Sequence, residues 1–224
     1  MNSLHVIITA GGSGTRMNSE IPKQFISIAG KPILMYTIEK FYNFDKNINI
    51  ILVLPQNHTK LWEKLCFEQN FLIKHKIAIG GNTRFDSIKS GLNYVSGEGL
   101  TATHDGVRPF VSFQTIQNCI DLADKTGNAI PVVKINDSIR KIENSNSSIQ
   151  NRELFRAVQT PQVFDNELIK TAYLQNFHTE FTDCASVVEK KGIKINITEG
   201  NIENFKITCP SDLIIALAYL NEGF

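Results

Sequence analysis

The stretch LHVIITAGGSGTRM, residues 4–17, joins a short apolar run to a loop that contains three glycines and an arginine. The run at residues 4–9 is continuous and rich in β-branched residues, which is typical of a strand buried in a parallel sheet. Glycine lets the backbone after such a strand curl and point its N–H groups toward an anion. The stretch therefore predicts an α/β fold whose first strand ends at a phosphate-binding loop.

The sequence outward from this stretch alternates strands with helices. Residues 48–55, INIILVLP, form a second apolar run, and residues 31–44 carry apolar side chains at helical spacing after Pro32. Further strands are expected at residues 76–79, 100–103, 129–135, 194–198 and 204–208, and further helices at residues 58–69, 84–94, 112–124, 166–174, 184–191 and 212–220. This alternation predicts a mostly parallel, Rossmann-like sheet with helices on both faces and ligands at the carboxyl ends of the strands.

The composition is typical of a single domain. At 224 residues, 42% hydrophobic and 20% charged, the chain can bury a large core, and we expect one domain over residues 1–224. The formal net charge of +1 does not favour nucleic-acid binding. The four cysteines lie far apart without a C-x-x-C pair, which predicts free thiols in a reducing compartment and no zinc site. No apolar run approaches the roughly 18 residues that span a bilayer, so we expect a cytoplasmic protein that does not bind membranes.

Residues 136–154, NDSIRKIENSNSSIQNREL, interrupt the alternation. The segment is polar, with Asn and Ser in its middle and a short β-like run on each side, which is typical of a hairpin arm. Because an arm of this composition cannot bury itself, two interpretations remain. It is either a mobile surface hairpin or an arm that docks onto a second subunit.

The glycine loop does not fit two common phosphate-binding motifs. A Walker loop needs Gly-Lys-Ser/Thr after its first glycine, and a dinucleotide-binding loop needs a glycine where Met17 stands. What remains is a strand followed by open backbone amides, then Arg16 and, seven residues later, Lys23. These cations can stabilise charge that accumulates on a phosphate during a reaction. A tight turn with two solvated cations is the alternative.

Several motifs together resemble one family of nucleotidyltransferases. The loop AGGSGTRM and the following PKQF are similar to the triphosphate loop of enzymes that join a sugar or polyol phosphate to a nucleoside monophosphate. Further segments fall in the order and spacing of the 2-C-methyl-D-erythritol 4-phosphate cytidylyltransferase family: GGNTRFDSIKSGL (80–92), HDGVRPF (104–110), VQTPQVF (158–164), FTDCASVVE (181–189) and NFKITCPSDL (204–213). The resemblance covers essentially the whole chain and implies the three-layer nucleotidyltransferase fold.

The resemblance implies transfer of CMP from CTP to 2-C-methyl-D-erythritol 4-phosphate, with release of pyrophosphate. Both substrates are anions and the attacking phosphate is already ionised. Cations, backbone amides and a divalent metal should therefore carry the rate, and no protein nucleophile is expected. The implied cofactor is Mg²⁺, held mainly by the CTP phosphates. Two alternatives stay open: a ribitol 5-phosphate cytidylyltransferase, which would share the nucleotide half of the site, and a non-catalytic nucleotide-binding scaffold.

The positions that match the family carry its roles on the nucleotide side. Arg16 and Lys23 match the residues that stabilise the transition state at the α-phosphate. Gly81 and Ser87 match positions that read the cytosine, although Ser87 could also be an ordinary residue at a helix start. Asp105 matches an acid at the ribose and metal side, which makes it the candidate direct ligand of Mg²⁺. The implied nucleotide-binding residues are Ala10, Gly11, Gly12, Ser13, Gly14, Gly81, Asn82, Ser87 and Asp105.

The acceptor side is drawn from distant parts of the chain. Arg152 and Lys206 match the residues that orient the acceptor phosphate, and they complete the catalytic candidates. The residues implied to bind the acceptor are Asp105, Arg108, Ser138, Arg152, Thr160, Thr182 and Lys206. Ser138 and Arg152 stand at the two roots of the 136–154 arm, which in this family crosses to a second subunit and completes its acceptor site. The resemblance therefore implies a homodimer with shared sites.

The chain also departs from the family pattern. Gly106 and Val107 stand where the family commonly has two alanines, and Ser138 stands where a threonine is usual. The strand-to-arm join at residues 131–138 is about two residues longer than usual, which could change how the arm reaches its neighbour. His104, beside Asp105, invites a role as a general base. A packing role is favoured, because an ionised acceptor phosphate needs no base.

Overall fold

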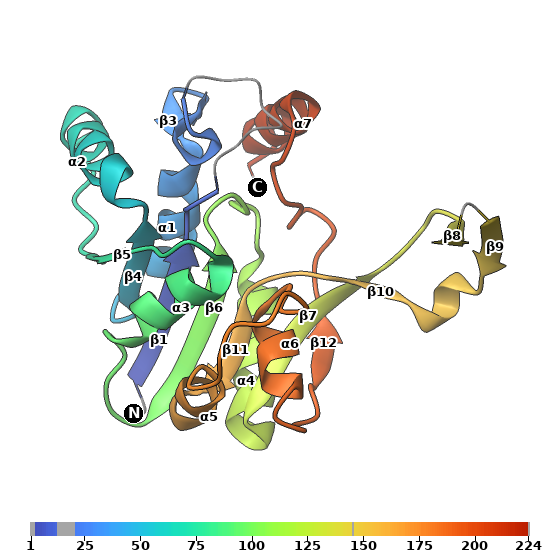
Figure 1. Cartoon of the computed structure of the whole chain (residues 1–224). Coiled ribbons are helices and arrows are strands. Elements are labelled where there is room, and N and C mark those ends of the chain that lie inside the picture. Colours follow the sequence, from blue (N-terminus) through green and yellow to red (C-terminus); the bar gives the residue numbers. More distant parts are fainter. Residues whose placement is uncertain (1–2, 13–20, 145, 224) are drawn as a thin grey trace.

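The computed structural model describes residues 3–12, 21–144 and 146–223 of the chain (Figure 1). Its centre is an eight-stranded sheet in the order β10-β7-β11-β6-β1-β4-β5, with β12 on β7. Strands β6, β1, β4 and β5 are parallel, whereas β11 is antiparallel to both β6 and β7, and β10 is antiparallel to β7. The strand bounds are β1 Ser3–Thr9, β4 Asn49–Leu54, β5 Lys76–Ile79, β6 Gly99–Asp105, β7 Asn128–Lys134, β10 Arg156–Val158, β11 Gln162–Asp165 and β12 Ile197–Glu199.

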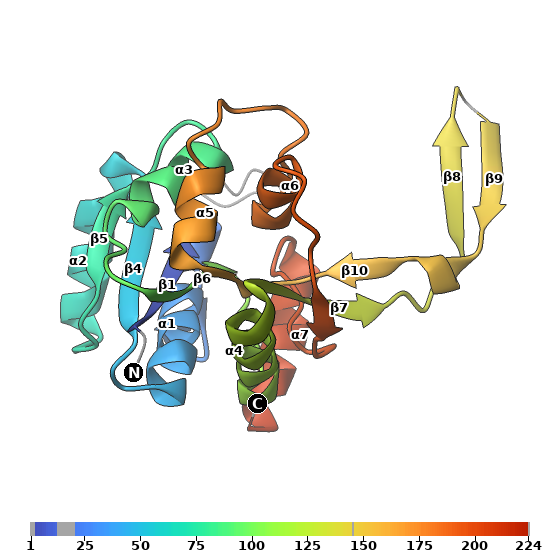
Figure 2. The same cartoon turned by 90° about the horizontal axis from the view of Figure 1, so that it is seen from below.

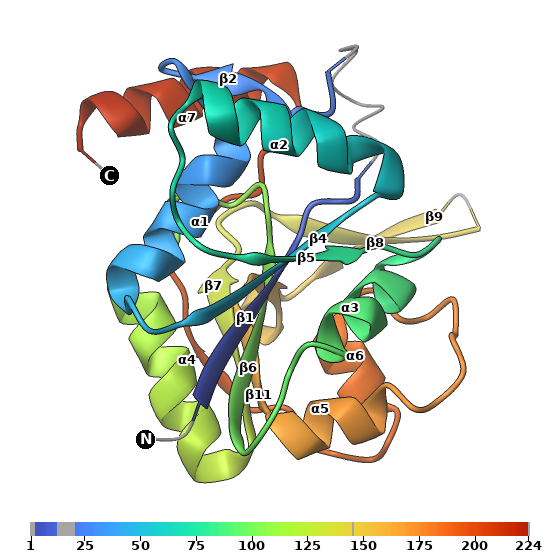
Figure 3. The ribbon, with the colours of Figure 1, turned by 90° about the vertical axis from the view of Figure 1, so that its left-hand side faces the viewer.

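Helices cover both faces of this sheet, as Figure 3 shows for α1 and α4 on one side and α3, α5 and α6 on the other. The first face carries α1 Ile33–Phe44, α2 Thr59–Glu68 and α4 Phe113–Thr126, and the second carries α3 Arg84–Leu92, α5 Asn166–Ala172 and α6 Cys184–Glu189. The three layers confirm the predicted α/β class.

The central strands contribute to two cores at once. Along β1, Val6 and Ile8 pack into the core under α1 and α2, while Ile7 packs into the core under α3. All three side chains are fully buried. A strand that buries both of its faces cannot alternate polar with apolar residues, which is the reason that residues 4–9 form a continuous apolar run.

A third, smaller core closes the end of the sheet where the first loop emerges. Helix α7, Pro210–Asn221, packs there against the short strands β2 Ser27–Ile28 and β3 Lys31–Pro32, and Figure 1 shows α7 beside β3. The buried side chains of this third core include Val107, Ile207 and Ala216. The same end carries the single-turn helix η2, Lys23–Phe25. This packing holds Lys23 and the chain around Lys206 over one edge of the sheet.

The arm projects from the body, as Figures 1 and 2 show. It consists of β8 Ile139–Glu143 and β9 Asn146–Gln150, which pair only with each other, followed by the short helix η4 Arg152–Leu154. Ile142 and Ile149 are 67% and 65% exposed. The predicted hairpin is present, and its strands bury almost nothing within their own chain.

The structure differs from the predicted elements in several places, among them the unpredicted short strands β2 and β3. Residues 204–208 form no strand; Ile207 makes one backbone hydrogen bond to Val107, and Thr208 bonds instead to the Asp212 carboxylate at the start of α7. The strand expected at residues 194–198 is the shorter β12. Finally, the short antiparallel strands β10 and β11 were not predicted, and they are the antiparallel part of a sheet that is otherwise parallel, as expected.

All four cysteines are free thiols, and Cys119 and Cys184 are fully buried. Among the described residues, none of the helices is both long and apolar enough to cross a bilayer.

Candidate active site

The first loop leaves β1 at the carboxyl edge of the sheet, where several other chain segments meet. Ala10 donates its N–H to the Val53 carbonyl of β4 at 3.0 Å and accepts a bond from Gln24 Nε2 at 2.7 Å. Lys23, which directly precedes Gln24 in η2, donates Nζ to the Ile207 carbonyl at 3.5 Å. Ser13, Gly14 and Arg16, which the sequence placed in this site, lie outside the described residues. The described start of the loop is thus fixed between β4 and η2.

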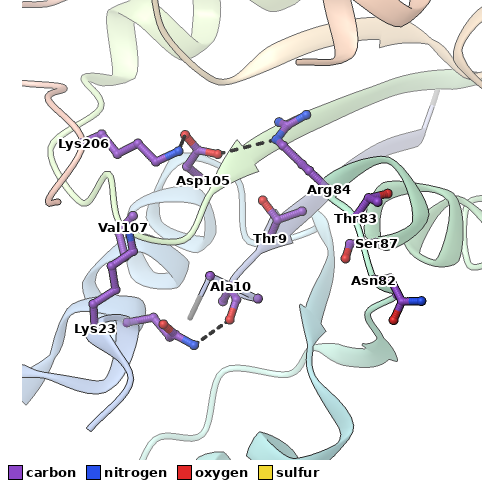
Figure 4. Close-up of a pocket in the computed structure, with 14 residues that line it drawn as sticks. Thr9, Ala10, Lys23, Asn82, Thr83, Arg84, Ser87, Asp105, Val107 and Lys206 are labelled. Atoms are coloured by element: carbon purple, nitrogen blue, oxygen red, sulfur yellow. Dashed lines mark hydrogen bonds and ion pairs between the residues drawn. The ribbon is translucent and has the colours of Figure 1, made fainter. Parts of the chain in front are cut away.

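A pocket of about 230 Å³ opens beside this loop (Figure 4). It brings together nine residues that the sequence singled out: Ala10, Gly11, Gly12, Lys23, Gly81, Asn82, Ser87, Asp105 and Lys206. It also includes five that the sequence did not single out: Thr9, Gln24, Thr83, Arg84 and Val107. We call it the nucleotide pocket because every described nucleotide-binding candidate lines it.

The N-terminus of α3 forms one wall of the nucleotide pocket. Thr83 caps the helix by accepting the Asp86 N–H at 3.0 Å, and the Asp86 carboxylate accepts the Thr83 N–H in return at 3.2 Å. A Cβ atom at Gly81 would collide with the Asp86 side chain, so only glycine lets the chain pass this close to the helix. The helix therefore presents its positive end, with Ser87 in its second turn, to the pocket.

Asp105 ends β6, and three cations surround its carboxylate. Lys206 Nζ lies 3.0 Å and Arg108 Nε 3.2 Å from Oδ2, and Arg84 Nε lies 3.9 Å from Oδ1. Figure 4 shows Asp105 between Lys206 and Arg84. Burial alone would raise the pKa of Asp105, but the three cations hold it well below its usual range. The carboxylate is therefore ionised at neutral pH and held in place from both sides.

His104 is buried and holds the strand end beside Asp105. Its Nε2 lies 3.0 Å from the Arg108 carbonyl oxygen and its Nδ1 lies 3.0 Å from the Thr160 hydroxyl, which in turn accepts the Asp105 N–H at 3.2 Å. Because a carbonyl only accepts, Nε2 carries the proton and neutral Nδ1 accepts from Thr160. Burial lowers the pKa of His104 to about 4. The geometry gives His104 the packing role rather than that of a general base.

A second pocket of about 240 Å³ lies on the other side of Asp105. It contains four predicted acceptor-binding residues besides Asp105, namely Arg108, Thr160, Thr182 and Lys206, and five that were not predicted, namely Arg84, Val158, Gln159, Gln162 and Asp183. Arg108 is held by a 2.7 Å bond from Nη1 to the Asn204 carbonyl. We call this the acceptor pocket. Arg84, Asp105 and Lys206 line both pockets and form their shared wall.

Ser138 and Arg152 do not join either pocket. Both are exposed at the base of the arm, where the Arg152 guanidinium donates to the Asn136 carbonyl and lies 3.7 Å from Glu153. Within one chain, the structure therefore does not bring these two predicted acceptor residues to the others.

Arg84 is the most informative residue that the sequence reasoning missed. Its side chain reaches Asp105 on one side, and Nη1 donates to the Cys184 sulfur at 3.3 Å on the other. Burial alone would lower the pKa of Arg84, but Cys184 and Asp105 raise it above its usual value. The signal was available: Thr83 and Asp86 form a T-x-x-D capping box, which places Arg84 in the first turn of a helix at the strand edge.

The described residues offer a metal little beyond Asp105. Residues 3–12, 21–144 and 146–223 contain no cluster of three or more His, Cys, Asp or Glu side chains able to hold an ion. The two Asp105 oxygens are already paired with Lys206, Arg108 and Arg84. This donor set does not fit a magnesium site built by the protein itself.

Comparison with known proteins agrees over almost the whole chain. The family model described as 2-C-methyl-D-erythritol 4-phosphate cytidylyltransferase matches residues 4–222. The chain is 48% identical over 215 residues to the protein of that name from Bacteroides thetaiotaomicron, covering 96% of this chain and 98% of that one. It is 50% identical over 212 residues to the one from Phocaeicola vulgatus, covering 95% and 97%.

Solved structures match the fold equally fully. The crystal structure of 4-diphosphocytidyl-2C-methyl-D-erythritol synthase from Anaerococcus prevotii superposes with a TM-score of 0.82 at 29% identity, covering 98% of this chain and 96% of that one. The cytidylyltransferase structure from Thermus thermophilus gives a TM-score of 0.79 at 28% identity, covering 98% and 99%. Sequence and fold thus point to the same set of relatives.

Proposed function

The chain belongs to the 2-C-methyl-D-erythritol 4-phosphate cytidylyltransferase family, and from this premise we propose how its two adjoining pockets divide that family's reaction. The enzyme is a nucleotidyltransferase of isoprenoid precursor synthesis. It transfers CMP from CTP to 2-C-methyl-D-erythritol 4-phosphate and releases pyrophosphate, leaving 4-diphosphocytidyl-2-C-methyl-D-erythritol. The observation that carries our proposal is the shared wall of Arg84, Asp105 and Lys206, since a transfer between two anions needs two cationic pockets that meet.

In the nucleotide pocket, we assign the triphosphate to the loop at residues 10–14 and the cytosine to the wall made by Gly81, Asn82 and Ser87. The open glycine amides of this loop favour phosphate oxygens. Lys23 and Arg16 then meet the charge that develops on the α-phosphate and on the departing pyrophosphate. Transfer of this kind asks for position and charge rather than covalent chemistry from the protein.

In the acceptor pocket, we assign the acceptor phosphate to Lys206 and the polyol hydroxyls to the ionised Asp105, with Arg108, Thr160 and Thr182 around them. A carboxylate held by three cations cannot move freely, so it offers the substrate's hydroxyl groups a fixed hydrogen-bond partner. Lys206 reaches both pockets and would bring the attacking oxygen toward the α-phosphorus. No proton has to be removed, because the attacking phosphate is ionised at neutral pH.

Magnesium would arrive with CTP and be held mainly by its phosphates. The ion would neutralise phosphate charge and so help the two anions to approach. Asp105, fully paired with cations in this structure, is not assigned as its ligand. This refines the sequence-based hypothesis of a direct Asp105 bond to the metal.

We further propose that the whole chain is one catalytic domain that works as a homodimer through the 136–154 arm. Ile142 and Ile149 are exposed on a hairpin that pairs with no other strand in the described part of the chain, and this supports a partner for the arm. In this arrangement Ser138 and Arg152 would reach the acceptor pocket of the second subunit. A cytoplasmic location is proposed as well, on the support of four free cysteines.

The decisive test of the activity is an acceptor comparison. Purified protein with CTP and Mg²⁺ should release pyrophosphate when 2-C-methyl-D-erythritol 4-phosphate is added, with a kcat/KM well above that for ribitol 5-phosphate. A preference for ribitol 5-phosphate would overturn the acceptor assignment, and no release with either would overturn the activity. Replacing CTP by ATP should lower turnover sharply, and equal rates would remove Gly81 and Ser87 from base recognition.

A further inference from the structure

The buried thiol of Cys184 receives an unusual set of contacts for a core cysteine. The side chain is 0% exposed, yet its sulfur lies 3.3 Å from Arg84 Nη1, 3.2 Å from Thr103 Oγ1 and 3.2 Å from the Tyr173 hydroxyl. Buried free cysteines usually behave as small apolar residues. The sulfur of Cys119, which is equally buried in the other core, has no hydrogen-bond partner among the described residues. The surroundings of the Cys184 sulfur are therefore polar, although the side chain is fully buried.

Four elements of the fold meet at this sulfur. Arg84 begins α3, Thr103 lies in β6, Tyr173 follows α5 and Cys184 itself begins α6. Helix α3 is a wall of the nucleotide pocket, whereas Thr182 and Asp183, which come directly before Cys184, line the acceptor pocket. The sulfur thus joins the wall of one pocket to the wall of the other.

Aromatic packing supports the same connection. Phe85, next to Arg84, stacks on Tyr173 with ring centroids 4.7 Å apart and on Phe181 with centroids 5.6 Å apart. Phe181 belongs to the loop that leads into α6 and carries Thr182. Helix α3 and this loop are therefore tied at two neighbouring points, one apolar and one polar.

The guanidinium of Arg84 completes the link, because it lies between this sulfur and Asp105. Its Nη1 donates to Cys184, while its Nε lies 3.9 Å from Asp105 Oδ1 in the shared wall of the two pockets. Only a planar group with donors on two sides can contact both partners at once. Without the sulfur, Arg84 would be free to swing away from the Asp105 carboxylate.

We propose that Arg84 and Cys184 are a pair of positioning residues for the transfer: the Cys184 sulfur holds the Arg84 guanidinium, which fixes Asp105 and the Thr182–Asp183 wall for the acceptor. The inference rests on the proposed function of the two pockets. Neither residue of the pair is required to touch the reacting phosphorus. The pair acts on the acceptor side, because Cys184 directly follows Thr182 and Asp183, which line the acceptor pocket and not the nucleotide pocket.

The test compares steady-state kinetics of Cys184→Ala, Cys184→Ser and Arg84→Lys with the parent enzyme. Cys184→Ala should raise the KM for 2-C-methyl-D-erythritol 4-phosphate roughly fivefold to tenfold, the scale of one lost hydrogen bond, while the KM for CTP stays within about twofold. Cys184→Ser, which keeps an acceptor for Arg84, should return the acceptor KM to near the parent value. Arg84→Lys, which lacks the fork, should resemble Cys184→Ala.

Cys119→Ala is the matched control, since it removes an equally buried sulfur from the opposite core. It should lower thermal stability less than Cys184→Ala does, because it removes no polar contact, and it should leave both KM values unchanged. In the double variant Arg84→Lys with Cys184→Ala, the effect on acceptor KM should not exceed that of either single change, because both break one link.

Three results would overturn the proposal: a parental acceptor KM in Cys184→Ala, no rescue by serine, or full additivity in the double variant. If Cys184→Ala does not fold, the serine and Arg84→Lys variants carry the test. Failure of the proposed function itself would be distinguishable, because the parent enzyme would then release no pyrophosphate.

Discussion

The body and the arm hold their candidate site residues in opposite ways. In the body, Asp105 is nearly buried and paired with Lys206, Arg108 and Arg84, so its geometry is set before any substrate arrives. On the arm, Ser138 and Arg152 lie exposed at the base of a hairpin whose two strands pair with no other strand among the described residues. One region is preorganised by its core, whereas the other requires a second surface to define its place.

This difference separates two kinds of binding residue. Preorganised groups lose little conformational entropy when a ligand binds, whereas exposed long side chains must give up rotamer freedom. A site that is divided between them can form only when the arm is held. Changes in the body and changes in the arm should therefore have separable effects on activity.

The largest effect is expected from Lys206→Ala in the body. Removing this cation deletes a contact to both pockets and leaves Asp105 with two of its three partners. We expect kcat/KM for the acceptor to fall by about 10²-fold or more, on the scale of lost electrostatic stabilisers, with a smaller change in CTP binding measured by calorimetry. Lys191→Ala, an exposed lysine elsewhere, should change neither. A larger loss of CTP binding than of acceptor use would reverse the assignment of Lys206.

Arg152→Ala tests the arm by the same measurement. A charge-assisted contact to phosphate is worth about 1.5–3 kcal/mol, so a loss of roughly 10-fold to 100-fold in acceptor kcat/KM is expected. Both changes should act on the same pocket, although the two residues lie in different regions of the chain.

Mixing the two variants decides whether the arm serves its own chain or a partner. In a randomly mixed dimer population, half of the molecules pair Lys206→Ala with Arg152→Ala, and one of their two sites is intact. Activity should then recover to about a quarter of the parent value if sites are shared between subunits. Activity no higher than the mean of the two variants would show that each arm serves its own subunit or none.

Acidification should weaken the body through His104. Its pKa in the folded state is about 4, below the ordinary value of 6.5. Between these two values the unfolded chain binds a proton at His104, whereas the folded chain does not. Stability is therefore complete above pH 6.5 and falls as the pH drops toward 4. From His104 alone, the free energy of unfolding should be about 2 kcal/mol lower at pH 5 than at pH 7.5, measured by urea denaturation.

His104→Gln, which cannot be protonated, is the control for this slope. Its urea curve should lose most of the difference between pH 7.5 and pH 5. The part that remains would belong to His5, His58 and His75, whose pKa values burial also lowers. An unchanged slope in His104→Gln would mean that His104 does not carry the effect. The 136–154 arm contains no histidine, so none of this histidine-linked change in the free energy of unfolding should come from the arm.

The sequence predicted the body better than the connections between its parts. Continuous apolar runs such as residues 4–9 identify strands buried on both faces, because only the core of an α/β sheet requires them. The short strand β11 was missed since its four residues carry too little periodicity. Residues 204–208 have strand-like composition. The Thr208 N–H, however, bonds to the Asp212 carboxylate at the start of α7, and Lys206 lines the pockets instead of lying in a strand.

The site was predictable where a motif fixed it locally, and less so where distant segments meet. Gly81, Asn82 and Ser87 lie in one short motif and line one pocket. Arg84 was missed because its value depends on Cys184, one hundred residues later, and on Asp105. Contacts of this kind arise from packing, and no spacing in the sequence records them.

The smallest effect is expected from the apolar residues of the arm. Ile142 and Ile149 are 67% and 65% exposed, so replacing both by serine removes little buried surface from the single chain. The free energy of unfolding of the body should stay within about 0.5 kcal/mol of the parent under conditions where the protein is monomeric. Sedimentation at higher concentration should instead show weakened association of this variant, and removal of residues 144–148 should weaken association in the same way.

Ile169→Ser, at a fully buried position of α5, is the matched control and should destabilise the body strongly. If the paired arm variant lowered the stability of the monomer as Ile169→Ser does, the arm would belong to the core of its own chain, and the contrast between the two regions would fail. If association were unchanged, a partner for the arm would have to be sought on its polar face.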